Sequence, residues 1–390
     1  MPFTSISRLL PQDTSPGLAQ LGLGLVLSVS VYQLSHFHLR SLCRYFFASP
    51  PPGPRGTKVC KLDFAPSDIG WADRSFLLLF GVLYKAVRRR VVGTGLKLAK
   101  GAETVELPRL ELMCPIDIGD GHKELYGRAV AQSEETEVGT DQGGNGMERQ
   151  FLLAAMTNQL MLLLVVHPKL PVSPLGGVNV RNRIESHSPL PVPTGPLTAH
   201  AYVGGKDDAA RVVKRGIEFD IHIDIHDSHH LILRQTITIL TLCKTHITSS
   251  NSTPQAAPAA RQFDTIGRIH MTTSSPSLWC RVCGDYNPIH VSATLARLFG
   301  FRGKIAHGNH VVAKLLHLYA CQQSGGGLVG VEKEEGWWIE MQFKRPMVLP
   351  LRMSAQLEQG AGRQSRQWQC VAEEHGKEDK VYVLGSLGRS

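Results

Sequence analysis

The order of apolar and polar side chains along the middle of the chain predicts an antiparallel sheet. Within a strand candidate at 216–225, residues 219–226 alternate strictly, with isoleucine or phenylalanine on one face and aspartate or histidine on the other. A second strand candidate, 231–242, follows an Asp227-Ser228 turn. Such alternation is typical of a strand buried on one face. We expect further strands over 110–113, 126–131, 178–185 and 197–203.

Two longer apolar segments predict buried helices. Residues 151–166 are apolar on nearly every side, as a helix inside a wrapped sheet must be, and are too short and too deep in the chain to favour a membrane span. Residues 301–322 place valines and leucines at helical spacing, and an extended run follows from Trp337. A helix followed by strands and by prolines four residues apart occurs twice, at Pro189 and Pro193 and again at Pro346 and Pro350. The repeat predicts two tandem α+β units.

We therefore divide the chain into four segments. Residues 1–56 are an N-terminal hydrophobic anchor or targeting segment with a proline-rich linker at 48–57, and 57–244 form the first folded unit. Residues 245–259 are a linker and 260–390 the second unit, while the acidic, glycine-rich residues 133–148 predict an exposed loop.

The N-terminal segment leaves two interpretations open. Residues 18–34 are uncharged and mostly apolar, at the lower limit for a membrane span, and Arg40 and Arg44 follow them. The first 56 residues hold one acid, Asp13, against four arginines, which also suits a mitochondrial presequence. We expect a membrane-anchored protein, with a mitochondrial one as the alternative.

Composition and net charge limit the classes of molecule that the protein is expected to bind. The chain has 390 residues, 42% of them hydrophobic, and a formal net charge of +9, which suits an anionic partner. No nucleic-acid-binding motif is present, so we expect no nucleic-acid partner. Arg88, Arg89 and Arg90 follow a helix candidate at 76–87 and suit a solvated helix end. The eight cysteines show no pairing rhythm, and we expect Cys280 and Cys283 to serve packing rather than a metal or redox site.

The most informative segment is Cys-Gly-Asp-Tyr-Asn-Pro-Ile-His at 283–290. Asn287 suits a helix N-cap and Pro288 the first helical position, so His290 falls in the first turn, where the helix dipole disfavours an imidazolium. Asp285 and a neutral His290 can divide the two proton transfers of one reaction. Gly308, at the start of the later helix, offers a backbone N–H to a developing oxyanion.

Three motifs resemble the MaoC-like dehydratase family, which includes the R-specific (type 2) enoyl-CoA hydratases: Gly284 to His290, Ile305-Ala306-His307-Gly308 and Phe343-Lys344-Arg345-Pro346. The resemblance implies a tandem hot-dog fold, in which each unit is a long helix wrapped by a curved antiparallel sheet. It implies that Asp285 and His290 are the catalytic pair and that the Gly308 amide forms the oxyanion hole. Asn309 and His310 replace the apolar pair that usually follows this His-Gly in the family, so the length of the substrate's acyl chain is left open. The first unit lacks the motif and is expected to be the non-catalytic half of an intramolecular pseudo-dimer, with a homo-oligomer left open.

The expected function is that of an (R)-specific enoyl-CoA hydratase or 3-hydroxyacyl thioester dehydratase. It acts on an acyl-CoA or acyl carrier protein thioester, without cofactor or metal. Candidate catalytic residues are Asp285, Asn287, His290 and Gly308. Candidates for binding coenzyme A phosphates are Arg181, Arg183 and Lys304, although solvation of a strand face explains the first two equally well. The alternatives are a non-catalytic, membrane-tethered acyl-thioester-binding protein and a hot-dog thioesterase.

Other histidines have simpler interpretations. Asp220, His222, Asp224, His226, His229 and His230 have the spacing of a metal site on one strand face, yet a solvent-facing polar strand gives the same pattern, which we favour. We interpret His307 and His317 as structural.

Overall fold

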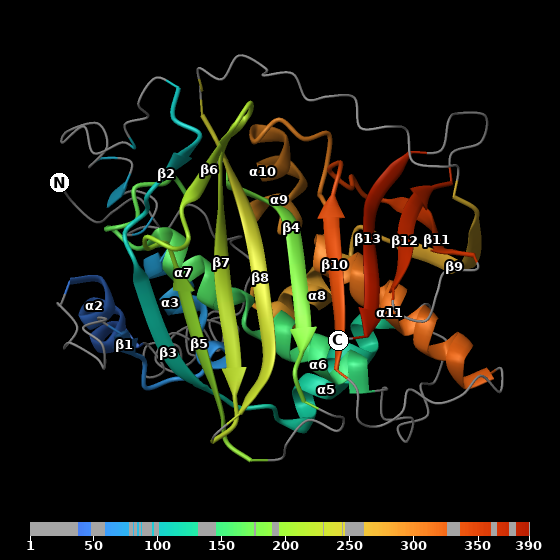
Figure 1. Cartoon of the computed structure of the whole chain (residues 1–390), viewed down its shortest axis with the longest axis horizontal. Helices are drawn as coiled ribbons and strands as arrows, with labels where there is room; N and C mark the ends of the chain where they lie inside the picture. Colours follow the sequence, from blue (N-terminus) through green and yellow to red (C-terminus); the bar gives the residue numbers. More distant parts are fainter. Residues whose placement is uncertain are drawn as a thin grey trace, which may run out of the picture.

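The computed structural model describes residues 38–47, 59–77, 101–131, 146–174, 177–188, 195–228, 230–243, 261–325, 336–359, 365–373 and 380–389, with single positions at 81, 84, 85, 87, 96 and 245. Within these residues the strands form one continuous sheet, and helices lie behind it (Figure 1). The order along the sheet is β1-β3-β5-β7-β8-β4-β10-β13-β12-β11-β9, and β2 and β6 pair at its side.

The first half of the sheet comes from residues 59–242. Its strands are β1 (Val59–Lys61), β2 (Thr104–Val105), β3 (Leu110–Ile116), β4 (Gly177–Ser186), β5 (Leu197–Val203), β6 (Ala210–Val213), β7 (Gly216–His226) and β8 (Leu231–Leu242). Its helices are α2 (Leu39–Phe47), which precedes the sheet, α3 (Trp71–Phe76), α5 (Asp120–Val130), α6 (Gly146–Met156) and α7 (Asn158–Val166), with a short 3-10 turn, η2, at Pro66–Asp68.

The second half comes from residues 263–389. Its strands are β9 (Phe263–Met271), β10 (Trp337–Phe343), β11 (Leu351–Glu358), β12 (Ser365–Ala372) and β13 (Val381–Arg389). Its helices are α8 (Ser275–Cys283), α9 (Pro288–Val291), α10 (Ala293–Leu298) and the long α11 (Gly308–Gly325).

The two halves meet where β4 pairs antiparallel with β10, from Trp338 opposite Glu185 to Gln342 opposite Arg181. Helices α6, α7 and α11 pack behind the joined sheet and their apolar side chains enter one core (Figure 1). The fold is the predicted α+β tandem hot-dog, in which each half wraps a buried helix.

Most predicted strands are confirmed, and the alternation in β7 has the predicted meaning. Ile221 and Ile223 are fully buried, whereas the polar positions between them face their own partners. Arg211 donates to Asp220 at 2.8 and 3.0 Å, and Arg234 donates to Asp224 at 2.7 and 2.8 Å. Ion pairing along the outer strand face therefore accounts for the acidic positions of the Asp/His pattern.

The strand predicted at 126–131 is wrong, because these residues lie at the end of helix α5. Tyr126, Ala129 and Val130 are buried at helical spacing, and Lys123 pairs with Asp120 one turn earlier at 2.8 Å. A six-residue window around Tyr126 was too short to show the helical period. The predicted loop 133–148 also extends too far, because Glu148 already lies in α6, where it is buried.

The helix predicted at 151–166 is interrupted at Thr157, whose hydroxyl donates to the Ala154 carbonyl at 3.0 Å. Residues Met147–Val166 have the length and composition of a membrane span, but 83% of that window is buried inside the fold. The segment is therefore a core helix with a break, as its place behind the sheet in Figure 1 also shows.

Several predictions fall outside the described residues. These are the hydrophobic segment 18–34, the linker 48–57, most of the helix at 76–87 with Arg88 to Arg90, most of the loop 133–148, the linker 246–259, and the first proline motif at 189–193. The domain boundaries at 56, 244 and 259 stay predictions.

A chain of buried polar side chains crosses the interior from the helix break to the start of α11. The Thr157 hydroxyl lies 3.5 Å from the side-chain amide oxygen of Gln235. The Gln235 side-chain amide donates to the Asn182 side-chain oxygen at 3.3 Å, and the Asn182 side-chain amide donates to the Asn309 side-chain oxygen at 3.2 Å. Thr157, Gln235 and Asn182 are completely buried. These buried hydrogen bonds link α11 of the second half to β4 and β8 of the first.

Replacing Asn182 by leucine leaves the amides of Gln235 and Asn309 without their partner. We expect a loss of about 1–3 kcal/mol in the free energy of unfolding, measured by urea denaturation. Asn179→Leu is the matched control on the same strand, because the buried Asn179 side-chain oxygen has no hydrogen-bond partner among the described residues. Equal stability of the two variants would show that the polar chain contributes nothing.

Candidate active site

The Asp285 loop is shaped by the end of α8. Gly284 has φ 68°, and its N–H donates to the Cys280 carbonyl at 2.8 Å, so the chain turns sharply and leaves the helix. Asn287 then caps α9 as predicted, accepting from the Ile289 N–H at 3.3 Å. The Asn287 N–H donates to the Asp285 carboxylate at 3.0 Å, which fixes the acid one turn before His290.

The backbone carbonyl of Asp285 is held by two further donors. The Cys280 thiol donates to it at 3.0 Å and the His307 Nε2–H at 3.1 Å. Burial, followed by the charge of Asp285, raises the pKa of Cys280 to about 12, so the thiol keeps the proton that it donates. Cys280 and Cys283 are both buried, in agreement with the predicted packing role.

His290 has a defined tautomer. Its Nδ1 lies 2.7 Å from the Ile305 carbonyl oxygen, and because a carbonyl only accepts, the neutral ring carries its proton on Nδ1. The lone pair on Nε2 is then available to take a proton from a substrate or a water. The Ile305 carbonyl also orients this ring, because Ile305 belongs to the segment that leads into α11.

His307 stacks on His290 with ring centroids 3.7 Å apart. Burial, and then the neighbouring His290, lowers the pKa of His307 to about 3, so this second ring stays neutral. Its Nε2 also lies 3.8 Å from the Asp285 carboxylate, and its buried Nδ1 has no partner among the described residues. His307 therefore lies beside Asp285 and His290, and its contacts agree with the structural role that the sequence analysis gave it.

Asp285, His290 and His307 each offer one potential metal-ligand atom, and these atoms lie within 4.8 Å of one another. The hydrogen bonds favour a different use. His290 Nδ1 and His307 Nε2 are committed to backbone carbonyls, so His290 Nε2 and the Asp285 carboxylate are the groups left to exchange protons.

Gly308 follows His307 in the chain and begins α11. As the first residue of the helix, it has an N–H without an intrahelical acceptor. A side chain at Gly308 would collide with Phe343, since an added Cβ would lie 2.2 Å from the phenyl ring. Glycine therefore lets the end of β10 approach the helix start closely.

The first half contacts both segments of the candidate site. The Gln159 side chain packs so tightly against Gly284 that an added Cβ would meet it at 1.9 Å. His310 and Lys314 of α11 hold the end of α5 through the carbonyls of Ala129 and Ala131, at 2.8 and 2.7 Å. His310, which replaces an expected apolar residue, thus has a structural partner, and its ring also stacks on Trp279 of α8 at 4.9 Å.

The three cations predicted to bind coenzyme A lie in different surroundings. Arg183 pairs with Glu185 at 2.7 Å and Glu340 at 3.4 Å and covers the Trp338 ring, so its charge is already compensated. Lys304 donates to the Thr273 carbonyl at 3.3 Å. Arg181 lines a groove near the start of β4.

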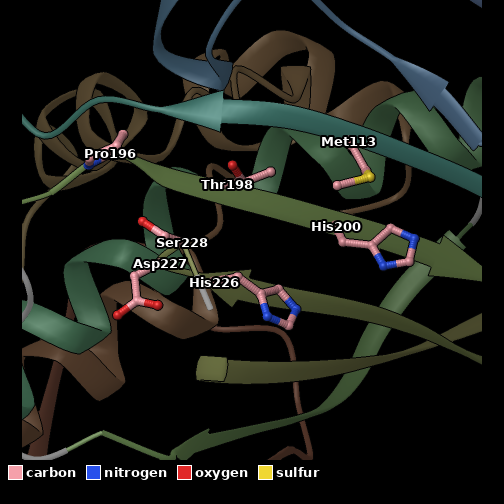
Figure 2. A pocket seen from close by; sticks show the side chains of 7 residues that line it. All are labelled: Met113, Pro196, Thr198, His200, His226, Asp227 and Ser228. Carbon is pink, nitrogen blue, oxygen red and sulfur yellow. The ribbon is translucent and has the colours of Figure 1, made fainter. Parts of the chain in front are cut away.

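A pocket of about 460 Å³ lies elsewhere, on the outer face of the first half, and Figure 2 shows the side chains that line it. His200 of β5 and His226 of β7 belong to it, together with Met113 of β3 and the Asp227-Ser228 turn. His200 is already paired with Glu111 at 3.2 Å. No residue of the Asp285 to Gly308 site lines this pocket, so the two are separate.

Comparison with known proteins places the second half in a family. The model of the MaoC like domain matches residues 254–380. The chain carries a MaoC-like dehydratase domain. A relative of this domain, 3-hydroxyacyl-thioester dehydratase X of Mycobacterium tuberculosis, is 24% identical over 209 residues, which cover 53% of this chain and 69% of the relative.

Solved structures extend the likeness beyond the MaoC-like domain to both halves of the fold. The crystal structure of HtdX from M. tuberculosis has a TM-score of 0.53 at 18% identity and covers 74% of this chain and 99% of its own. A MaoC-like dehydratase from Phytophthora capsici has a TM-score of 0.52 at 14% identity, with coverages of 73% and 96%. At these identities the likeness concerns the fold alone.

Three buried histidines make the stability of the protein sensitive to acid. Burial lowers the pKa of His307 and His310 to about 3 and that of His167 to about 4, against an ordinary value of 6.5. Between pH 6.5 and these values the unfolded chain binds more protons than the folded one, so stability is full above pH 6.5 and falls as the pH decreases. Each group contributes up to about 1.4 kcal/mol per pH unit.

We expect the urea midpoint of unfolding to fall steeply as the pH is lowered below about 6. The variant His310→Gln keeps a donor for the Ala129 carbonyl, and we expect it to reduce the slope of the urea midpoint against pH by roughly one third. His317→Gln is the control, because the half-exposed His317 has an acidic partner, Glu148, at 2.9 Å. A slope that His310→Gln leaves unchanged would contradict the burial of a neutral His310.

Proposed function

We propose that the protein is a hydro-lyase that adds water to, or removes it from, the 2,3-bond of a fatty acyl thioester with R specificity. The observation that carries the proposal is that the Asp285 carboxylate and the His290 ring lie together with His307, the residue that precedes Gly308 at the start of α11. A base, an acid and an oxyanion donor are what this reaction needs, and the MaoC-like domain supports the reaction class.

In the hydration direction, the pair takes a proton from water, and the resulting hydroxide bonds to C3 of the enoyl thioester. The electrons of the double bond move to the thioester oxygen, where the Gly308 N–H stabilises the enolate. The enolate collapses as C2 receives a proton from the same pair. Dehydration is the reverse. We assign the two proton transfers to Asp285 and His290 jointly, because interacting groups titrate as a pair.

Asn287 and His307 hold this pair in position. The Asn287 N–H orients the Asp285 carboxylate, and its side chain starts the helix that carries His290. His307 supports the Asp285 carbonyl with its Nε2–H and the His290 ring with its face. A neutral His307 does this without adding a positive charge next to His290.

Replacing either member of the pair should abolish most of the activity. We expect Asp285→Asn and His290→Gln each to lower kcat for hydration of trans-2-enoyl-CoA by roughly 10²–10⁴-fold, measured across several chain lengths. Asp264→Asn and His317→Gln are matched controls, one exposed on β9 and one on α11 outside the site. If wild type and both site variants are equally inert, the hydro-lyase proposal is wrong.

The N-terminal anchor remains a proposal that rests on sequence alone. A fluorescent protein fused after residue 60, with and without the first 48 residues, separates a membrane anchor from a mitochondrial presequence. Membrane residence that does not depend on residues 1–48 would contradict both.

A further inference from the structure

A groove of about 480 Å³ opens at the edge of the sheet where β4 begins and β10 ends. Four of its lining residues are cationic, namely Arg181 of β4, Lys214 and Arg215 of the turn between β6 and β7, and Lys344 just after β10. One lining residue, Glu218, is acidic, and it already lies 4.0 Å from Arg211. The groove therefore has an excess of positive charge.

The cations of this groove differ from the other arginines on the same strands. Arg183, Arg211 and Arg234 are each paired with a carboxylate at 2.8 Å or less. Arg181, Lys214 and Arg215 make no ion pair with any described residue. A cluster of uncompensated cations in a concave surface is suited to a multiply charged anion.

The groove and the candidate oxyanion amide share a wall. Phe343 lines the groove, and its ring packs directly against Gly308. On the neighbouring strand, Arg181 lies in the groove while the next residue, Asn182, donates to Asn309, which follows Gly308. Successive strand residues point to opposite faces, so the groove lies on the outer face of the sheet, and the ends of β4 and β10 stand between it and the Gly308 amide.

We propose that this groove binds the phosphate groups on the pantetheine arm of the thioester substrate. The proposal rests on the proposed hydro-lyase function, which supplies a thioester at Gly308. Arginine guanidinium groups bind phosphate oxygens in a bidentate fashion, and lysines add charge. The groove is not lined by Arg183 or Lys304. The charge of Arg183 is already compensated by two glutamates.

The test compares substrates that share one enoyl group but differ in their phosphates: enoyl-CoA, enoyl-3′-dephospho-CoA, enoyl-4′-phosphopantetheine and enoyl-pantetheine. The full-length chain is assayed as wild type, as the Lys214→Ala/Arg215→Ala double variant and as Arg181→Ala. The double variant changes only a two-residue exposed turn, which protects its folding. Lys206→Ala removes an exposed cation outside the groove and is the control for net charge.

We expect wild type to prefer enoyl-CoA over enoyl-pantetheine in kcat/KM, and the groove variants to reduce this preference by roughly tenfold or more while Lys206→Ala keeps it. The preference should also weaken as salt is raised. If enoyl-4′-phosphopantetheine keeps the advantage, the groove recognises the phosphate that coenzyme A shares with acyl carrier protein. If the advantage needs the additional phosphates, coenzyme A is the carrier.

A preference that the groove variants retain, or a wild type that treats all four substrates alike, would overturn the proposal. If no substrate is hydrated, the proposed reaction fails, and calorimetric titration with free coenzyme A then decides the groove alone. Binding by wild type that the double variant loses supports it, and equal binding or no binding by both overturns it.

Discussion

The antiparallel pairing of β4 with β10 is the constraint on which the rest of the structure depends. It joins two wrapped sheets into one and so sets the first half, which lacks the Asp285 motif, beside the half that carries it. That placement brings Asn182 to Asn309, Gln159 to Gly284, and α5 to α11. Each of these contacts fixes a segment next to Asp285 or Gly308, so the first half acts as the rigid support that a preorganised site requires.

Within the candidate site, Asp285 and His290 are fixed largely by backbone carbonyls and buried neutral donors. The Ile305 carbonyl sets the tautomer of His290, while Cys280 and His307 hold the carbonyl of Asp285. Buried neutral donors orient the Asp285 loop without adding charge, as the proton transfers proposed for Asp285 and His290 require. A positively charged His307 would instead compete with that chemistry, and burial prevents it from forming.

The sequence predicted those features of the structure that depend on residues close together in the chain. The Asn287 cap, the helix from Pro288 and the alternating strands β7 and β8 follow from short-range rules, and the structure has them as expected. The stacking of His307 on His290 and the compensation of Arg183 by Glu340 join residues that are not neighbours in the chain, so no short sequence window shows them. The error at 126–131 had another cause, because six residues from the end of α5 resemble a strand as well as a helix.

The most direct test of the central claim is to incubate the protein with a trans-2-enoyl-CoA in ²H₂O and to analyse the product by NMR and chiral chromatography. We expect a (3R)-3-hydroxyacyl-CoA that carries one deuterium at C2, with the thioester intact. Release of free coenzyme A and the unsaturated acid would identify a thioesterase instead. Recovery of unchanged substrate, with no deuterium at C2, would contradict a hydro-lyase built on Asp285, His290 and Gly308.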